Sequence, residues 1–248
     1  NGDPIVQPTK DMILGAYWAT MFEPGAAGEG LIFADEKEAI MAYEFRIVDL
    51  RAKVKIRIVE RRVTAEDARP PIIETTVGRI LFNRNLPPDY PFINTEVTFS
   101  YVEDLVGSLI QRYSIAKIPP VLDALKEFGF RFATISGLSW GMDDLRIPAQ
   151  KQEWIRDAEK EISQIDDYYQ RGFLTERERY DRVVEIWRDV MDKVKEAVPK
   201  TLDPTGSVSI MINSKARGSW FLTMQMAGMK GLVINPAGKI IELPVLSS

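Results

Sequence analysis

The most regular pattern of hydrophobic and polar positions lies in residues 148–199. Apolar side chains recur three and four residues apart on both sides of a short polar break, and they are Ile155, Ala158, Ile162, Ile165 and Tyr169 before it and Tyr180, Val183, Trp187, Val190, Val194 and Ala197 after it. A sustained 3-4 alternation places an apolar seam along one side of each helix, as in an antiparallel coiled coil. We therefore predict two helices packed along these seams, with Pro148 in the first turn and Pro199 ending the second helix.

The break between the two helices has the residues of a specified turn. Gly172 can adopt the left-handed backbone that ends a helix. Thr175 and Glu178 have the spacing of a capping box, which starts the next helix. At 1.5 Å per residue each helix spans roughly 30 Å. A pair of this length buries only its own seam, so we expect it to protrude from the rest of the chain.

Residues 1–147 show shorter and more mixed patterns. The apolar run at 12–22 predicts a helix with Asp11 as its N-cap. Residues 36–45 carry apolar positions at helical spacing and predict a short amphipathic helix. From Leu50 to Ile58, apolar residues alternate with basic ones, which is typical of a half-buried strand. The basic face of this strand is either an ordinary solvated face or a surface that meets phosphate.

Three further patterns complete the predicted architecture. Residues 72–83 predict a second strand with a break at Gly78, and residues 102–136 predict two short helices separated by Pro119 and Pro120. The sequence NPAGK at 235–239 predicts a turn between short strands. The predicted fold class is α+β: a mixed helix and strand body with a protruding antiparallel helical hairpin.

Composition removes several classes of function. The 248-residue chain has a net charge of −4 and contains neither cysteine nor histidine. Disulfides, thiolate metal sites and enzymes of the Ser-His-Asp or Cys-His type are therefore excluded. No apolar run reaches the length that spans a membrane. The chain begins without methionine, which we interpret as the boundary of a fragment.

Few residues suggest chemistry of their own. Asp143 and Asp144 permit a metal or acid–base hypothesis, but a carboxylate that accepts backbone hydrogen bonds in a turn is the more ordinary role. Lys215 and Arg217 lie in the small-residue stretch SKARGS, which is either an anion-facing loop or a plain surface loop. Methionines 224, 226 and 229 suit an adaptable surface or a core. Asp3 and Asp11 have the positions of turn and cap residues.

Five stretches, in this order, resemble blocks of the bacterial RNA polymerase β′ subunit. They are NGDPIVQPTKDMILGAYWAT, ETTVGRILFN, GLSWGMDDLRIP, GFLTERERYDRVVEIW and SKARGSWFLTMQMAGMKGLVINPAGKIIELPV. The resemblance covers essentially the whole chain. It departs from the family at Lys215, where a glycine is usual, at Lys10, where a glutamine is usual, and at Thr223 or Met224, where an arginine is usual. Residues 63–72 and 89–130 match poorly, so no role is assigned to them.

The resemblance implies a non-catalytic part of the subunit. The family's NADFDGD loop, which holds the catalytic Mg²⁺, would precede this chain, and the bridge helix and trigger loop would follow it. Catalytic and metal-binding residues are therefore expected to be absent here, and no cofactor is expected in this part. The implied domains are a pore-like α+β domain at 1–147, the rim-helix coiled coil of the funnel at 148–199, and a channel-lining loop with short strands at 200–248.

The resemblance also implies partners and sites. The partners are the β, α and ω subunits, Gre-type cleavage factors and DksA-like regulators, with DNA, RNA and NTP only in the full enzyme and the bacterial cytoplasm as the location. Lys215, Arg217 and Gln225 would face NTP in the secondary channel. The factor-binding residues would be Arg171, Gly172, Phe173, Leu174, Thr175, Arg177 and Arg179. Two alternatives stay open: a free-standing helical-hairpin adaptor and a metal-dependent enzyme centred on Asp143 and Asp144.

Overall fold

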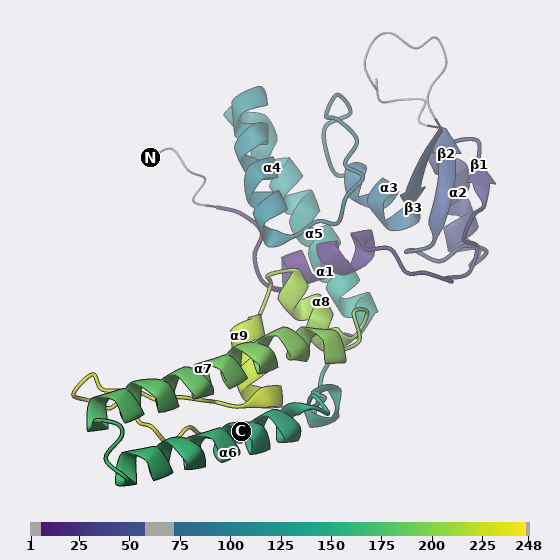
Figure 1. The fold of residues 1–248 in the computed structure, drawn as a ribbon. Helices are drawn as coiled ribbons and strands as arrows, with labels where there is room; N and C mark the ends of the chain where they lie inside the picture. Colours follow the sequence, from purple (N-terminus) through teal and green to yellow (C-terminus); the bar gives the residue numbers. More distant parts are fainter. Residues whose placement is uncertain (1–5, 58–71, 247–248) are drawn as a thin grey trace. The chain divides into compact units, whose positions relative to one another are not determined.

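The computed structural model describes residues 6–57 and 72–246 and divides the chain into two compact units. The first unit comprises Asn1–Ser139 with Asn213–Arg217, and the second comprises Trp140–Ile212 with Gly218–Ser248. Helices predominate and one small sheet is present (Figure 1), so the predicted mixed α+β class is confirmed. The units divide the chain at places other than 147 and 199, and the three-domain scheme stays a prediction. No helix within the described ranges is long and apolar enough to cross a membrane.

The sheet of the first unit has the order β1-β2-β3. β1 (Ile32–Phe33) runs parallel to β2 (Lys53–Arg57), and β2 runs antiparallel to β3 (Ile72–Thr76). The predicted alternation is confirmed in β2, because Val54 and Ile56 are buried against α2 (Glu36–Glu44) while the basic residues between them are exposed. Position 58 lies outside the described residues.

The basic face of β2 is neutralised from within the sheet. Lys53 and Lys55 both reach Glu74 on the neighbouring strand, at 3.4 Å and 3.5 Å. The Lys53 ammonium also lies 5.3 Å from the centre of the Phe22 ring, which is a cation–π distance. These contacts favour the solvated-face interpretation over a surface that meets phosphate.

The prediction of one strand over residues 72–83 is wrong after Thr76. A helix, α3 (Val77–Asn83), begins there, and the Thr76 hydroxyl caps it by accepting a hydrogen bond from the Arg79 amide at 3.2 Å. Gly78 is therefore inside a helix, and a Cβ at this position would collide with the Ala19 carbonyl. The glycine permits close packing of α3 on α1 (Asp11–Thr20) and does not mark a strand break.

Helices α1, α4 (Phe99–Arg112) and α5 (Ile118–Ser136) surround the main core of the first unit. Two α-helices were predicted in this region and two are present, but the prediction that Pro119 and Pro120 separate them is wrong, because the break lies at residues 113–117. Pro119 and Pro120 lie in the first turn of α5, where the missing amide hydrogens cost no hydrogen bond, and a short 3₁₀ turn at Ile115–Lys117 precedes them. α1 crosses α5 at Gly15 and Gly129, each of which leaves room for the backbone of the other helix.

The prediction that Asp11 caps α1 is wrong. The helix begins at Asp11 itself, and the cap position is Lys10, whose φ of 53° is left-handed and whose side chain makes no cap hydrogen bond. The Asp11 carboxylate instead pairs with Arg217. The other acidic residue assigned to a turn, Asp3, lies outside the described residues.

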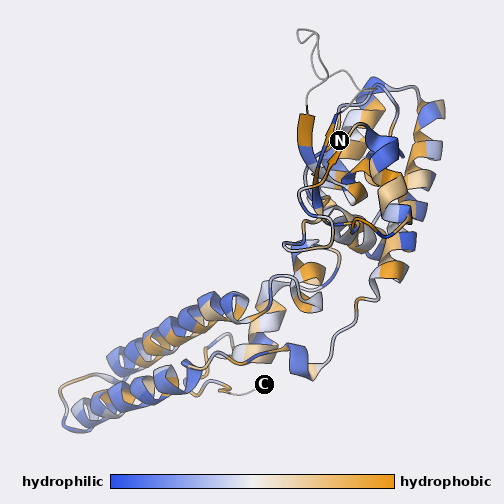
Figure 2. Cartoon of the chain, turned by 90° about the vertical axis from the view of Figure 1, so that its right-hand side faces the viewer, coloured by the Kyte–Doolittle hydropathy of each residue, from blue (hydrophilic) through white to orange (hydrophobic). Residues whose placement is uncertain are grey.

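The second unit is built on α6 (Lys151–Gln170) and α7 (Glu176–Thr201), which run antiparallel and pack side by side (Figure 1). Their exposed faces are predominantly hydrophilic (Figure 2). The buried members of the predicted seam are Ile155, Ala158, Ile165, Val183, Trp187, Val190 and Val194. Val198 takes the buried place expected for Ala197.

Neither proline lies where the pattern placed it in these helices. Pro148 precedes α6, and its carbonyl accepts the amide of Lys151, the first helical residue, at 3.1 Å. α7 passes through Pro199 and ends at Thr201, so the prediction that Pro199 ends the helix is wrong. A proline this close to the C-terminus removes a single amide hydrogen bond, which the last turn tolerates.

The remainder of the second unit is more helical than expected. α8 (Ser207–Asn213), α9 (Trp220–Thr223) and a π-helical segment (Met224–Gly228) occupy much of the region that was predicted to be loop. Met224 and Met229 are buried beneath α6 and α7, whereas Met226 is 40 % exposed. The NPAGK turn is confirmed, since the Asn235 amide donates to the Lys239 carbonyl at 2.9 Å and Ile234 bridges Ile240.

Candidate functional site

The turn between α6 and α7 is fixed by backbone hydrogen bonds at the end of α6. Gly172 has φ of 80°, and its amide donates to the Tyr169 carbonyl at 2.9 Å. The next amide, of Phe173, donates to the Tyr168 carbonyl at 3.0 Å. The left-handed Gly172 was predicted from the sequence and is confirmed. This turn, residues 171–175, is called the tip below.

The predicted capping box at the start of α7 is also confirmed. The Thr175 hydroxyl accepts the Glu178 amide at 3.3 Å, and the Glu178 carboxylate accepts the Thr175 amide at 2.8 Å and its hydroxyl at 2.7 Å. The amide of Thr175, followed by its hydroxyl, lowers the pKa of the Glu178 carboxyl below its ordinary value. The tip is therefore held from both helices.

The contribution of this cap is expected to depend on pH. Because the folded pKa of Glu178 is depressed, its stabilisation is complete above the ordinary carboxyl pKa of about 4.3 and is lost as the pH falls through the lower folded value. Hydrogen-exchange protection of the first-turn amides of α7 should therefore be lower in Glu178→Ala than in the parent at pH 6, and this difference should shrink by pH 3. Glu176→Ala, which removes a neighbouring carboxylate outside the cap, is the control. A difference that is the same at both pH values would contradict the prediction.

Two tip residues and one residue of the adjoining first turn of α7 direct their side chains to solvent. Phe173 is 72 % exposed and meets the Tyr168 ring edge-on at 6.4 Å between centroids. Arg171 pairs with Asp167 at 2.9 Å, and Arg177, on the first turn of α7, reaches Asp181 at 4.0 Å. Both guanidinium groups stay exposed, so each can exchange its partner for another carboxylate at little cost.

Leu174 and Arg179, which were predicted to bind partners, have contacts inside the unit. Leu174 packs against the core between the helices. Arg179 binds Asp166 at 3.2 Å and Glu242 at 2.6 Å, and it lies over the Tyr169 ring. The Tyr180 hydroxyl adds a hydrogen bond to the Ile240 carbonyl at 3.0 Å. These bonds tie the C-terminal segment to the helix pair.

Lys215 and Arg217 lie together in one loop of the first unit. Arg217 donates to Asp11 from two nitrogens, at 3.0 Å and 3.2 Å, and Lys215 donates to the Ser100 hydroxyl at 2.9 Å. Lys215 has a left-handed φ of 58°. Gln225 is half-buried in the π-helical segment of the second unit.

Asp144 has the turn role that was considered the more ordinary one. It ends a 3₁₀ turn, Met142–Asp144, and its carboxylate accepts the Gly141 amide at 2.7 Å. Within the described part of the chain, no three acidic residues are grouped in a way that could hold a metal ion. The pair at 143 and 144 thus lacks the further ligands that a metal site requires.

Comparison with known proteins decides the family. The family described as RNA polymerase Rpb1, domain 3, matches residues 1–145, and RNA polymerase Rpb1, domain 4, matches residues 174–244. The chain belongs to the RNA polymerase largest-subunit family. A free-standing adaptor unrelated to polymerase is thereby excluded.

Curated relatives of the polymerase family align along the whole chain. DNA-directed RNA polymerase subunit beta' of Dehalococcoides mccartyi is 39 % identical over 248 residues, covering 100 % of this chain and 18 % of the relative. The subunit of Desulforamulus reducens is 40 % identical over 245 residues, covering 99 % and 20 %. That of Clostridium botulinum is 37 % identical over 261 residues, covering 100 % and 22 %. The chain spans about a fifth of the length of these relatives.

Proposed function

We propose that this chain forms part of the wall of the secondary channel in a bacterial, cytoplasmic RNA polymerase. We also propose that its tip is a docking site for transcript-cleavage and regulatory factors of the Gre and DksA types. The alignment with β′ subunits along the whole chain supports the first half of the proposal. The exposed aromatic side chain of Phe173 on a rigid, doubly capped turn carries the second half.

The surface of the first unit fits a role inside a larger assembly. Phe45 is 71 % exposed, Ile115 is 84 % exposed and Ile47 is 59 % exposed. Large apolar side chains at such exposure suit burial against another protein surface. We propose that the β, α and ω subunits and the rest of the β′ chain supply that surface, and that DNA, RNA and NTP are met only in this assembly.

The tip has the properties of a small anchor for a protein partner. An exposed aromatic ring flanked by arginines is the composition that dominates binding energy in protein interfaces. Its backbone is fixed before binding, so little conformational entropy is lost when a partner docks. Arg171 and Arg177 would exchange their own carboxylates for those of an acidic partner. Leu174 and Arg179 support the tip from within.

A substitution at Phe173 tests the docking proposal. In RNA polymerase assembled with the full-length subunit that contains this chain, Phe173→Ala should weaken binding of a Gre-type factor roughly tenfold, because it deletes the exposed anchor and leaves the capped turn intact. Titration of factor-stimulated transcript cleavage measures this affinity. Glu159→Ala, which removes an exposed side chain on α6 away from the tip, is the control. Equal factor affinity in the parent and Phe173→Ala would overturn the proposed docking site.

The channel-facing role of Lys215, Arg217 and Gln225 is part of the same proposal. Arg217 is half-exposed and forms an ion pair with Asp11, so an incoming phosphate would compete with that carboxylate for the guanidinium. Mg²⁺ chemistry belongs to the family's aspartate motif, which this sequence does not contain. The described residues do not group into a set that fits the ion, and no catalytic step is assigned to them.

A further inference from the structure

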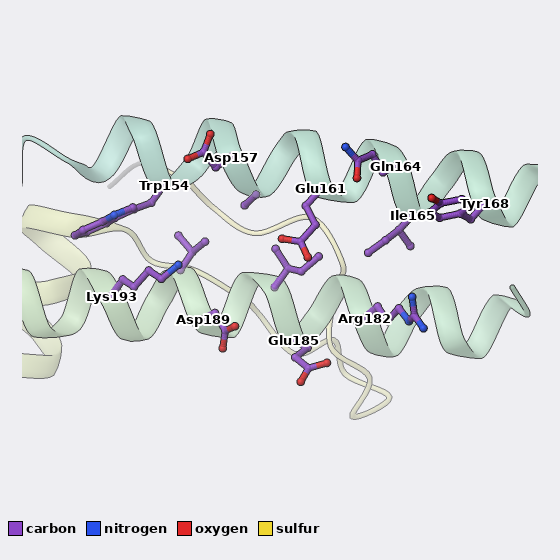
Figure 3. A pocket seen from close by; sticks show the side chains of 13 residues that line it. Trp154, Asp157, Glu161, Gln164, Ile165, Tyr168, Arg182, Glu185, Asp189 and Lys193 are labelled. Carbon is purple, nitrogen blue, oxygen red and sulfur yellow. The ribbon is translucent and has the colours of Figure 1, made fainter.

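A groove of about 480 Å³ runs between α6 and α7 (Figure 3). Its floor is apolar and its rim is charged. The floor consists of buried Ala158, Ile165 and Val190 with half-buried Trp154 and Ile186. The C-terminal segment packs on the far side of the helix pair, so this side of the seam is open to solvent.

Acidic residues stand at matching positions on the two rims of the groove. Asp157 is level with Asp189 and Glu161 with Glu185; the Glu161 carboxylate points toward α7, whereas those of Glu185 and Asp189 point away from α6 (Figure 3). Asp157 pairs with Lys160 on its own helix, and no ion pair joins the two rims among the residues that the structure describes. Antiparallel helix pairs ordinarily place opposite charges at such flanking positions, whereas both rims of this groove carry acidic residues.

Two bases also line the groove, one near each end. Lys193 lies at the end of the groove near Trp154, and Arg182 lies at the end near Tyr168 (Figure 3). The four carboxylates therefore occupy the middle of the groove, with one base at each end. The groove presents an apolar strip between two negative rims.

The dimensions of the groove favour an elongated occupant. Its lining runs from Trp154 to Tyr168 on α6, which is about 21 Å at 1.5 Å per residue. About four turns of a helix fit this length, whereas a compact small molecule would contact one part of it. On each rim the two carboxylates are four residues apart, roughly 6 Å, which matches the spacing of side chains at i and i+4 on a partner helix.

We propose that this groove binds a basic amphipathic helix of a protein partner, which completes a three-helix bundle with α6 and α7. The partner helix places apolar side chains on the floor and lysine or arginine at i and i+4 beside the two carboxylate pairs. Neutralising the carboxylates of the two rims adds specificity to the burial of apolar surface. The site is on the shaft of the helix pair, and the proposal does not depend on factor docking at the tip.

Peptide binding to the 248-residue chain tests the proposal. The probe is a fluorescent, lactam-stabilised helical peptide of about four turns, with leucine on one face and lysines at i and i+4 on its flanks. Its acidic twin carries glutamate in place of lysine. Fluorescence anisotropy should show saturable binding of the basic peptide alone. The double reversal Glu161→Lys with Glu185→Lys should weaken that binding about tenfold or more and allow the acidic twin to bind.

A matched variant distinguishes binding in the groove from an effect of the net charge of the helices. Glu159→Lys with Asp192→Lys makes the same change in net charge on exposed positions of the same helices, outside the groove. It should bind the basic peptide within about twofold of the parent, as should Phe173→Ala at the tip. Circular dichroism checks that each variant is folded. The proposal is overturned if the basic peptide does not bind the parent, if the groove variant retains binding, or if both double variants lose it equally.

Discussion

Gly15→Ala should destabilise the first unit by about 3 kcal/mol or more. The added Cβ would fall well inside van der Waals contact of the Gly129 carbonyl and would lie 2.5 Å from the Ala133 amide nitrogen. Both obstacles are backbone atoms of α5, so no side-chain rotation relieves the collision. The helices would have to separate, and their separation would open the core that contains Ile13 and Phe132.

The measurement is the free energy of unfolding from a urea titration followed by circular dichroism. Gly107→Ala is the matched control, since Gly107 is also helical but a Cβ there meets no atom within 4 Å. That variant should be more stable than the parent by about 0.5–1 kcal/mol, because alanine has the better helix propensity. Stability of Gly15→Ala within experimental error of the parent would contradict the close helix crossing.

Trp187→Ala should destabilise the second unit by about 3–5 kcal/mol. Trp187 is 5 % exposed and lies in the core shared by α6, α7 and the C-terminal segment. Truncation removes the largest side chain of this core and leaves a cavity that the flanking Ile155 and Val190 only partly fill. Because the same core anchors Met224 and Met229, the variant should also loosen residues 224–229.

Trp140 provides the comparison for this substitution. It belongs to the same unit and is 46 % exposed, so Trp140→Ala should change the free energy of unfolding by less than about 1 kcal/mol. Hydrogen exchange across residues 218–246 would show the loosening in Trp187→Ala and its absence in the control. Equal losses of unfolding free energy in the two variants would show that Trp187 is not essential to the core of the second unit.

Patterns that repeat along one element predicted the structure well. The seam from Ile155 to Val194, the left-handed Gly172 and the capping box of Thr175 and Glu178 all depend on residues within one or two helical turns. Such local requirements are written into the sequence at fixed spacings. The alternation in β2 was visible for the same reason.

Features that depend on distant residues were not predictable in this way. The β-branched residues before Gly78 favour a strand locally, yet α3 forms because Thr76 caps it and Gly78 packs against Ala19. Arg179 was expected to bind a partner, but its guanidinium donates a hydrogen bond to the Glu242 carboxylate, sixty-three residues later in the chain. Asp11 has the identity of a cap and is used instead by Arg217. In each case a tertiary contact outweighs a local preference.

The same distinction between local patterns and distant contacts applies to the candidate site. The shape of the tip was predictable, because its turn is local. The inward direction of Leu174 and Arg179 was not, because Leu174 packs against the core between the helices and Arg179 pairs with Asp166 and Glu242, all of which are tertiary contacts. The carboxylate spacing of the groove, four residues on each helix, is present in the sequence, but only the antiparallel alignment of α6 with α7 places Asp157 level with Asp189.

The discontinuity of the first unit has a consequence for synthesis on the ribosome. Asn213–Arg217 belong to this unit, and the Ser214 carbonyl accepts the Phe99 amide at 3.1 Å. A ribosome adds roughly 5–20 residues per second, so several seconds pass between the emergence of Ser139 and that of Asn213. During this interval Asp11 of α1 lacks its ion pair with Arg217, and the Phe99 amide of α4 lacks its hydrogen bond to the Ser214 carbonyl. The nascent first unit therefore stays unfinished until most of the second has been translated, which is an interval in which a chaperone can act.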